Sequence, residues 1–185
     1  MPETYHENLD KHFDVVPYGI PVAQHWISIA AIFEAIRKYN INHFIEIGAF
    51  KGGLGDMISM RKPFFQGFSY TGYEIDGSNY AQRLHGNPDY ITADVFNSEV
   101  VQDIHNRIQA TVGAVLLFCD NGDKPKEMQV FAPHLRVGDY MMNHDYPIEV
   151  TPDFLETFAR DFPFMREIQP EVYRLAEVSL WNRIA

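Results

Sequence analysis

Several acidic side chains in this sequence stand at the ends of short apolar runs, where they could bind one ligand together. Glu46, Glu74 and Asp120 each come at the end of such a run. Runs of this kind are typical of buried parallel strands, whose carboxyl ends share one edge of a sheet. We therefore expect the three carboxylates to face a single crevice. Carboxylates there suit an ammonium group, a set of hydroxyl donors or a divalent cation, and they disfavour a phosphate.

The turn after the first run is rich in glycine and reads Glu46-Ile-Gly-Ala-Phe-Lys-Gly52. Glycine lets the backbone approach a ligand closely, and the spacing of Leu54, Met57 and Ile58 predicts a helix directly after the turn. A dinucleotide fingerprint needs a glycine where this turn has a phenylalanine, and no P-loop lysine follows. The turn predicts ligand contacts from Gly48, Ala49, Phe50 and Gly52. The alternative is a tight strand-to-helix turn that holds no ligand.

The second run ends in Glu74-Ile-Asp76, and this tip is the candidate for binding ribose hydroxyls. An acidic residue at the end of the second strand has that role in other nucleotide-binding folds. Glu74 is the first choice and Asp76 the second, with Ile75 as a further contact. The alternative is a solvated acid at the end of a strand.

Asp120 and the pair His144-Asp145 follow two runs that predict neighbouring strands, 114–119 and 140–142. The three side chains are therefore candidate ligands of a divalent metal. Carboxylate oxygens suit Mg²⁺, Ca²⁺ or Mn²⁺, and an imidazole shifts the preference toward Mn²⁺, Fe²⁺ or Zn²⁺. If His144 is not a ligand, it is the natural general base, with Asp145 orienting it.

Composition narrows the class of protein and of partner. The 185 residues fit one domain, and 46% of them are hydrophobic, which is ordinary for a globular chain. The net charge of −10 and the lack of a basic cluster exclude a nucleic-acid partner. No apolar run is long enough to span a membrane, and the acidic N-terminus does not resemble a signal peptide. The single Cys119 predicts a buried thiol and a cytoplasmic location.

Apolar spacing predicts strands that alternate with helices. Five apolar residues repeat at helical spacing within 22–39 and predict a helix with one buried face: Trp26, Ile29, Ala30, Phe33 and Ile36. Further helices are expected over 77–86, after the caps Asn97 and Thr151, and over 126–135 after Pro125. Strands are expected over 44–47, 68–75, 89–93, 114–119 and 140–142, with two more within 164–184. Residues 1–21 form an N-terminal segment that covers the site, and 22–185 form the domain.

Three motifs resemble those of class I S-adenosylmethionine (AdoMet) methyltransferases. They are Glu46-Ile-Gly-Ala-Phe-Lys-Gly-Gly53, Gly72-Tyr-Glu-Ile-Asp76, and Asp120 with Gly138-Asp-Tyr-Met-Met-Asn-His-Asp145. The last is similar to metal-dependent small-molecule O-methyltransferases of the cephalosporin hydroxylase and macrolide-sugar O-methyltransferase group, and more distantly to catechol O-methyltransferases. The resemblance covers about residues 17–184. It implies a Rossmann-like, doubly wound α/β fold with a mostly parallel seven-stranded sheet and a C-terminal antiparallel strand.

The resemblance also implies roles for particular residues. The glycine-rich turn would wrap the methionine half of AdoMet, while Asp94 and Val95 would border the adenine; alternatively, Asp94 only caps the segment that follows. The group has an acidic pair where this chain has His144-Asp145, so that one hard metal ligand has become an imidazole. Catechol enzymes carry a catalytic lysine near the position of Lys124. That side chain is therefore either a base or a solvated lysine at the start of a helix.

The function expected from these patterns is AdoMet-dependent O-methylation of a small hydroxylated molecule, assisted by Mg²⁺ or Mn²⁺. Two alternatives stay open. One is a metal-independent methyltransferase with His144 as the base, and the other is a non-catalytic module that binds AdoMet or a nucleoside. The sequence leaves the acceptor and the formation of a homo-oligomer undetermined.

Overall fold

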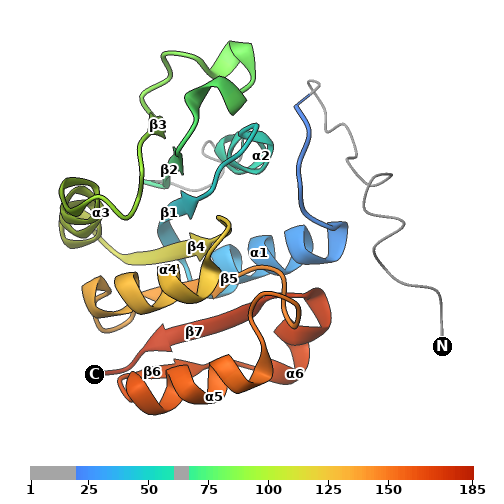
Figure 1. Cartoon of the computed structure of the whole chain (residues 1–185), viewed down its shortest axis with the longest axis vertical. Helices are drawn as coiled ribbons and strands as arrows, with labels where there is room; N and C mark the ends of the chain where they lie inside the picture. Colours follow the sequence, from blue (N-terminus) through green and yellow to red (C-terminus); the bar gives the residue numbers. More distant parts are fainter. Residues whose placement is uncertain (1–19, 61–66) are drawn as a thin grey trace.

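The chain forms one seven-stranded sheet, which we describe from a computed structural model that covers residues 20–60 and 67–185. The strands are β1 (Ile41–Ile47), β2 (Ser69–Glu74), β3 (Tyr90–Thr92), β4 (Ala114–Cys119), β5 (Tyr140–Asn143), β6 (Met165–Glu167) and β7 (Ser179–Arg183). Their order across the sheet is β3-β2-β1-β4-β5-β7-β6 (Figure 1). All neighbours pair in parallel except β7, which is antiparallel to both β5 and β6. This confirms the predicted doubly wound fold with an antiparallel C-terminal strand.

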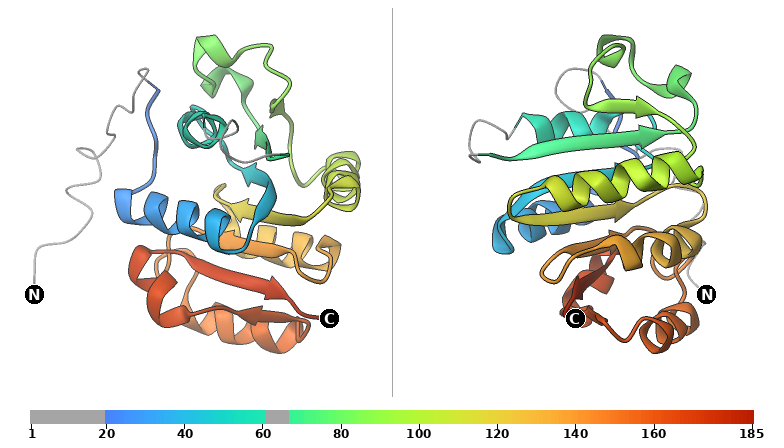
Figure 2. Two further views of the ribbon diagram at one scale, coloured as in Figure 1. Left: turned by 180° about the vertical axis from the view of Figure 1, so that it is seen from behind. Right: turned by 90° about the vertical axis from the view of Figure 1, so that its left-hand side faces the viewer.

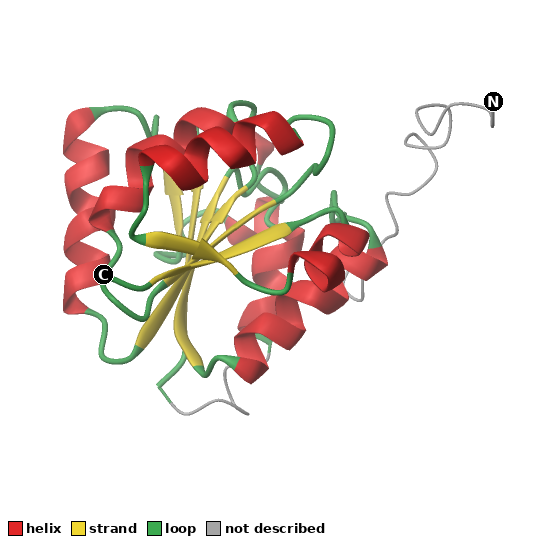
Figure 3. Cartoon of the chain, turned by 90° about the horizontal axis from the view of Figure 1, so that it is seen from below, coloured by secondary structure: helices red, strands yellow, loops and turns green. Residues whose placement is uncertain are grey.

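Helices cover both faces of the sheet. They are α1 (Trp26–Lys38), α2 (Gly53–Ser59), α3 (Ser98–Ala110), α4 (Lys124–Phe131), α5 (Pro152–Asp161) and α6 (Pro170–Tyr173). One apolar core joins the sheet to α1, α2 and α6, and a second joins it to α3, α4 and α5. Figure 2 shows α3 and α1 on opposite sides of the sheet, and Figure 3 shows the strands enclosed between helices. Cys119 is buried in the second core, as expected, and Trp181 is buried there as well.

The order of the strands reverses between β1 and β4. From β1 the chain proceeds outward to β2 and β3, and it then returns to pair β4 with the other side of β1. In doubly wound sheets this switch point leaves a crevice outside the carboxyl ends of the two strands. The turns that carry Gly48 and Asp120 therefore adjoin one another at that edge. No helix within residues 20–60 and 67–185 is both long and apolar enough to cross a membrane.

Helix α1 buries Ile29 and Ile36 as predicted, but its buried face is rotated from the one that the five apolar residues indicated. Trp26 is 53% exposed and Ala30 is also exposed, so the prediction was wrong for these two residues. The buried residues are Ser28, Ile29, Ile32, Ala35 and Ile36. The Ser28 hydroxyl donates a hydrogen bond of 2.8 Å to the backbone oxygen of Ala176. This contact places a polar residue on the inner face and turns Trp26 outward.

The helix predicted over 77–86 is absent and is replaced by two 3₁₀ turns, η3 (Gly77–Asn79) and η4 (Gln82–Leu84). The Asp76 carboxylate accepts a hydrogen bond from the Ser78 amide at 2.9 Å, which begins a turn instead. Tyr80 then leaves the helical conformation. Its hydroxyl donates to the backbone oxygens of Gly72 and Ile91 at 3.3 and 3.0 Å, which ties the segment to β2 and β3.

Other boundaries differ by a few residues. Helix α4 begins at Lys124, because the Asp123 side chain accepts a hydrogen bond from the Lys126 amide, and it ends at Phe131. The 3₁₀ turn η5 (Ala132–His134) follows, since Pro133 has no amide hydrogen to continue the helix. The predicted caps are confirmed: Asn97 accepts from Glu99 and Thr151 from Phe154. Between the two closing strands the chain forms α6 and the turn η6 (Arg174–Ala176).

Candidate functional site

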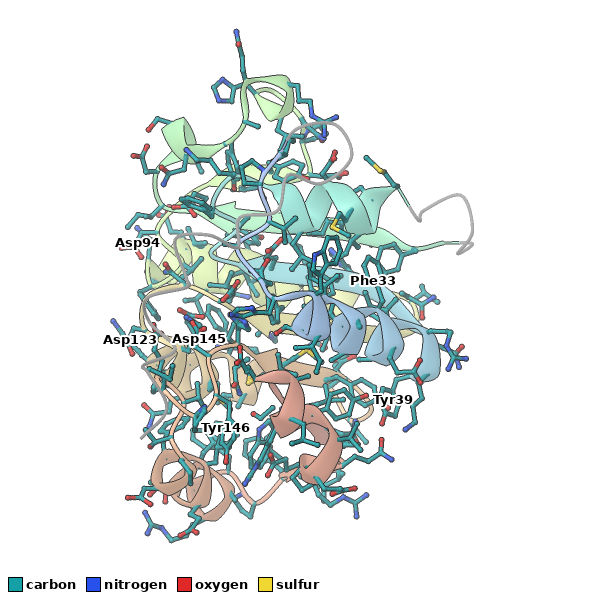
Figure 4. All side chains as sticks on the ribbon, turned by 90° about the vertical axis from the view of Figure 1, so that its right-hand side faces the viewer. Phe33, Tyr39, Asp94, Asp123, Asp145 and Tyr146 are labelled. Atoms are coloured by element: carbon teal, nitrogen blue, oxygen red, sulfur yellow. The ribbon has the colours of Figure 1, made fainter. Side chains whose placement is uncertain are left out.

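A cavity of about 380 Å³ lies at the switch point, at the carboxyl ends of β1, β2, β4 and β5. Its charged lining residues are Glu46, Lys51, Glu74, Asp120, Lys124, His144 and Asp145. Figure 4 shows Asp145 on the same side of the molecule as Asp94 and Asp123, whereas Tyr39, which precedes β1, lies on the other side. The acidic residues therefore meet at one edge of the sheet, as predicted.

The glycine-rich turn is held tightly against the ends of the neighbouring strands. Gly48 has a φ of +86°, and its amide and that of Ala49 both donate to the backbone oxygen of Tyr73 at 2.9 Å. Phe50 has a φ of +48°, which is uncommon for a residue with a side chain, and its amide donates to the Glu74 carboxylate at 2.8 Å. The turn is therefore held in place by its own contacts with the end of β2, and Gly48, Ala49 and Phe50 line the cavity.

Glu46 is 1% exposed and receives a hydrogen bond of 2.5 Å from the hydroxyl of Tyr70. Burial raises the pKa of Glu46 to about 8, and nearby Asp120 and Glu74 act in the same direction, although the hydrogen bond from Tyr70 opposes them. At pH 7 this carboxyl group is therefore mostly neutral. A cationic ligand group in the cavity would favour its ionised form.

Glu74 lies at the junction of the turn and the second strand tip. It is 8% exposed and accepts hydrogen bonds from the amide of Phe50, the amide of Asp76 and the side chain of Asn79. Glu74 lines the cavity, as the ribose assignment requires. Asp76 is exposed and holds the η3 turn, and Ile75 is 61% exposed. The structure therefore favours Glu74 over Asp76 by position.

The remaining candidates for contacts with the cofactor do not themselves line this cavity. Asp94 is exposed and accepts a hydrogen bond from the Phe96 amide at 2.9 Å, as the capping alternative requires. Val95 is 3% exposed and packs in the core with α3. Gly52 packs against Leu84. None of the candidates Gly52, Ile75, Asp94 and Val95 is among the described residues that line the cavity, so their contacts stay a prediction.

Asp120, His144 and Asp145 form a group whose candidate ligand atoms lie within 4.8 Å of one another. Nδ1 of His144 is 3.3 Å from an oxygen of Asp120 and 3.1 Å from an oxygen of Asp145. Burial lowers the pKa of His144, but its contacts with the two carboxylates outweigh burial and raise it overall. The donor set of two carboxylates and one imidazole fits a divalent ion such as Mn²⁺.

Lys124 reaches the same group from the start of α4. Its Nζ lies 2.8 Å from Asp145, 2.9 Å from Glu149 and 3.8 Å from Asp120. Burial lowers the pKa of Lys124, yet the three carboxylates raise it above its ordinary value overall. The side chain is 3% exposed, so the alternative of a solvated lysine at the start of a helix was wrong. Its ion pairs also disfavour the base, because an ammonium group has no lone pair with which to accept a proton.

Gln24 belongs to the site although nothing in its sequence context indicated a role. It precedes α1, lines the cavity and donates a hydrogen bond from its side-chain amide to Asp120. Pro21 lies directly against Gly53, so the start of the described chain crosses the glycine-rich turn. Residues 1–19, which were predicted to cover the site, lie outside the described residues. In the part of the chain that the structure describes, Oε1 of Gln24 and Nε2 of His144 are buried without a hydrogen-bond partner.

Solved structures with the same architecture identify the fold. A structure of CmcI with Mg and SAM has a TM-score of 0.68 at 14% identity, covering 91% of this chain and 76% of that one. A candidate caffeoyl-CoA O-methyltransferase from Staphylococcus aureus has a TM-score of 0.61 at 12% identity, covering 89% and 86%. The methyltransferase MycE, in complex with Mg, SAH and mycinamycin VI, has a TM-score of 0.51 at 16% identity, covering 86% and 50%.

This chain has the fold of class I AdoMet methyltransferases. No protein-family model and no curated protein matches its sequence. Within the methyltransferase fold, the cavity lies where the strand order reverses, and the glycine-rich turn, Glu46 and Glu74 form one wall of it. The group of Asp120, His144 and Asp145 also lines this cavity.

Proposed function

We propose that the chain is an AdoMet-dependent methyltransferase that acts on a hydroxyl group of a small molecule. The observation that carries this proposal is the pairing of a glycine-rich turn with two buried acids, Glu46 and Glu74, in one cavity at the switch point. Solved structures of the same fold are named with SAM or SAH. AdoMet has a cationic amino acid half and a ribose diol, which match the two acids in chemistry.

The proposed roles follow from the position and charge of each side chain. Glu46 would face the cationic methionine half, and Glu74 would accept hydrogen bonds from the ribose hydroxyls while it holds the turn through Phe50. AdoMet carries its own electrophilic methyl group, so the protein must position it and activate the attacking oxygen. His144 would accept the proton of that oxygen, with Asp120 and Asp145 fixing the ring.

A divalent metal is a second means of activation, but it would have to compete with the Lys124 ammonium group for Asp120 and Asp145. Asp120, His144 and Asp145 would hold it, and two of the solved structures are named with Mg. When bound there, such an ion would lower the pKa of a hydroxyl group that it coordinates. The metal-free alternative uses His144 alone. Full activity after exhaustive chelation would select that alternative.

The acceptor is proposed to be small and hydroxylated. The net charge of −10 disfavours nucleic acid, and four acidic side chains line the cavity. A cytoplasmic location stays a prediction from the single buried cysteine. A module that binds AdoMet without turnover is the competing function, and detection of methylated product separates it from an enzyme.

The first test is binding of the methyl donor. Isothermal titration should show that AdoMet and S-adenosylhomocysteine bind and that NAD does not. Glu74→Gln should weaken AdoMet binding about tenfold or more, because a carboxamide can no longer accept from two hydroxyls, a loss of about 1.4 kcal/mol. Asp76→Asn is the matched control and should change the affinity little, since Asp76 is exposed. Binding of NAD in place of AdoMet would refute the proposed function.

The second test separates chemistry from binding. Asp145→Asn should lower the rate of methyl transfer about 100-fold or more, because it removes a charge that orients His144, while the AdoMet affinity stays within about threefold. Asparagine keeps the size of the side chain and tolerates the φ of +60° at this position. Asp123→Asn, on the same side of the molecule, retains a good helix cap and should keep full activity. An equal loss of transfer and AdoMet binding would contradict separate roles.

A further inference from the structure

The Lys124 ammonium group is surrounded by oxygen atoms in the way that a bound cation would be. Its Nζ contacts carboxylate oxygens of Asp145 and Glu149 at 2.8 and 2.9 Å and the backbone oxygen of Asn121 at 3.0 Å. A carboxylate oxygen of Asp120 follows at 3.8 Å. The lysine is 3% exposed and the Asp120 side chain 8%, whereas the side chains of Asp145 and Glu149 are 35 and 42% exposed, so a buried ammonium group lies under two carboxylates that reach the surface.

Two of these carboxylates are the ones that could hold a divalent metal. Asp145 presents one oxygen to Lys124 and the other to His144, while a single oxygen of Asp120 faces both of these side chains. A metal ion that bound to Asp120 and Asp145 would therefore lie within a few ångströms of the ammonium group. Repulsion between like charges at such distances is strong where water is excluded.

Local structure fixes the lysine in this place. Lys124 is the first residue of α4, Pro125 follows it, and the Asp123 cap sets the direction of the first turn. The backbone oxygen of Asn121 accepts from the ammonium group and ties it to the turn after β4. The side chain therefore cannot leave the carboxylates without breaking three contacts of 3.0 Å or less.

We propose that the Lys124 ammonium group is the resident cation of the cluster formed by Asp120, Asp145 and Glu149, and that a divalent ion binds there only by displacing it. Because the lysine occupies this place, the unmodified chain has little affinity for a divalent metal. The residues of this donor set become a metal site when the lysine is removed. This inference concerns the cation and is independent of which ligand occupies the glycine-rich turn.

Direct measurement of Mn²⁺ binding, without AdoMet or an acceptor, tests the inference. Electron paramagnetic resonance of free Mn²⁺ should show that Lys124→Met binds one ion at least about tenfold more tightly than the unmodified chain. Lys126→Met is the matched control, because it removes the same charge from an exposed position two residues along the same helix. It should bind Mn²⁺ as the unmodified chain does. The double variant that carries Lys124→Met and Asp145→Asn should bind Mn²⁺ no more tightly than the unmodified chain does.

Two results would overturn the inference. One is tight binding of a single Mn²⁺ ion by the unmodified chain, with an affinity equal to that of Lys124→Met. The other is a folded Lys124→Met variant, judged by circular dichroism, that gains no affinity. If Lys124→Met does not fold, Mn²⁺ binding to the unmodified chain, with and without Asp145→Asn, tests the inference instead. Submillimolar Mn²⁺ binding that Asp145→Asn abolishes would refute a resident lysine cation, and weak binding that Asp145→Asn leaves unchanged would support it. Failure of the proposed function would instead appear in the titrations with AdoMet.

Discussion

Glu46→Gln should make the stability of the chain much less dependent on pH between pH 5 and pH 9. Burial raises the pKa of Glu46 from 4.5 to about 8 in the folded chain. On unfolding, the group returns to its ordinary pKa and releases its proton in this range. The contribution of Glu46 to the stability of the unmodified chain should therefore be fully present below pH 4.5. It should be lost as the pH rises to about 8.

The size of the effect follows from the pKa difference. A shift of about 3.5 units, from 4.5 to about 8, corresponds to about 5 kcal/mol at most, as an order of magnitude. Urea unfolding should be measured for both chains at pH 5, 7 and 9. As the pH rises, the free energy of unfolding of Glu46→Gln should increase by several kcal/mol relative to that of the unmodified chain. The unfolding of Glu127→Gln should be measured in the same way, because burial also raises the pKa of Glu127 to about 8. Parallel pH profiles for Glu46→Gln and the unmodified chain would show that Glu46 is ionised in the free protein.

The same group couples ligand binding to pH. A cationic ligand group at Glu46 requires the carboxylate, so binding must release a proton wherever the free chain is protonated. AdoMet affinity of the unmodified chain should therefore rise toward about tenfold per pH unit below pH 8 and level off above it. Glu46→Gln should bind weakly at every pH. Titrations in buffers of different ionisation enthalpy measure the released proton.

Gly48→Ala should strongly destabilise the chain. A Cβ at this position would lie 2.6 Å from the backbone oxygen of Asp120 and 2.7 Å from backbone atoms of Asn121. These are backbone atoms of the turn after β4, so they cannot rotate away. The φ of +86° adds a cost of about 1 kcal/mol for a residue with a side chain. We expect a loss of about 3 kcal/mol or more in unfolding free energy.

Gly138→Ala is the matched control for this substitution. Gly138 has a similar φ of +91°, but a Cβ there would meet no atom within 4 Å. It should therefore report the backbone cost alone, about 1 kcal/mol. Chemical denaturation of the two variants separates the clash from the conformational cost. A Gly48→Ala variant no less stable than Gly138→Ala would mean that the turns after β1 and β4 can move apart.

The amino-acid sequence alone determined the order of strands and helices and the residues at the strand tips. Buried parallel strands require apolar runs, and such runs can be recognised over a few neighbouring residues. The glycine-rich turn and the caps Asn97 and Thr151 are also local, because a turn or a cap depends on residues two or three positions apart. The resemblance of the motifs to those of AdoMet methyltransferases then supplied the sheet topology.

Tertiary structure decided which side chains meet and which way each one points. Gln24 contacts Asp120 across 96 positions of the chain, a contact that no local pattern predicts. Helix α1 turned Trp26 outward because Ser28 bonds to Ala176, on a segment that follows it by 148 positions. Lys124 became a buried cation because β4 and β5 bring Asp120 and Asp145 to the start of α4. Such contacts depend on strand order and helix rotation, which are set by the packing of the whole core.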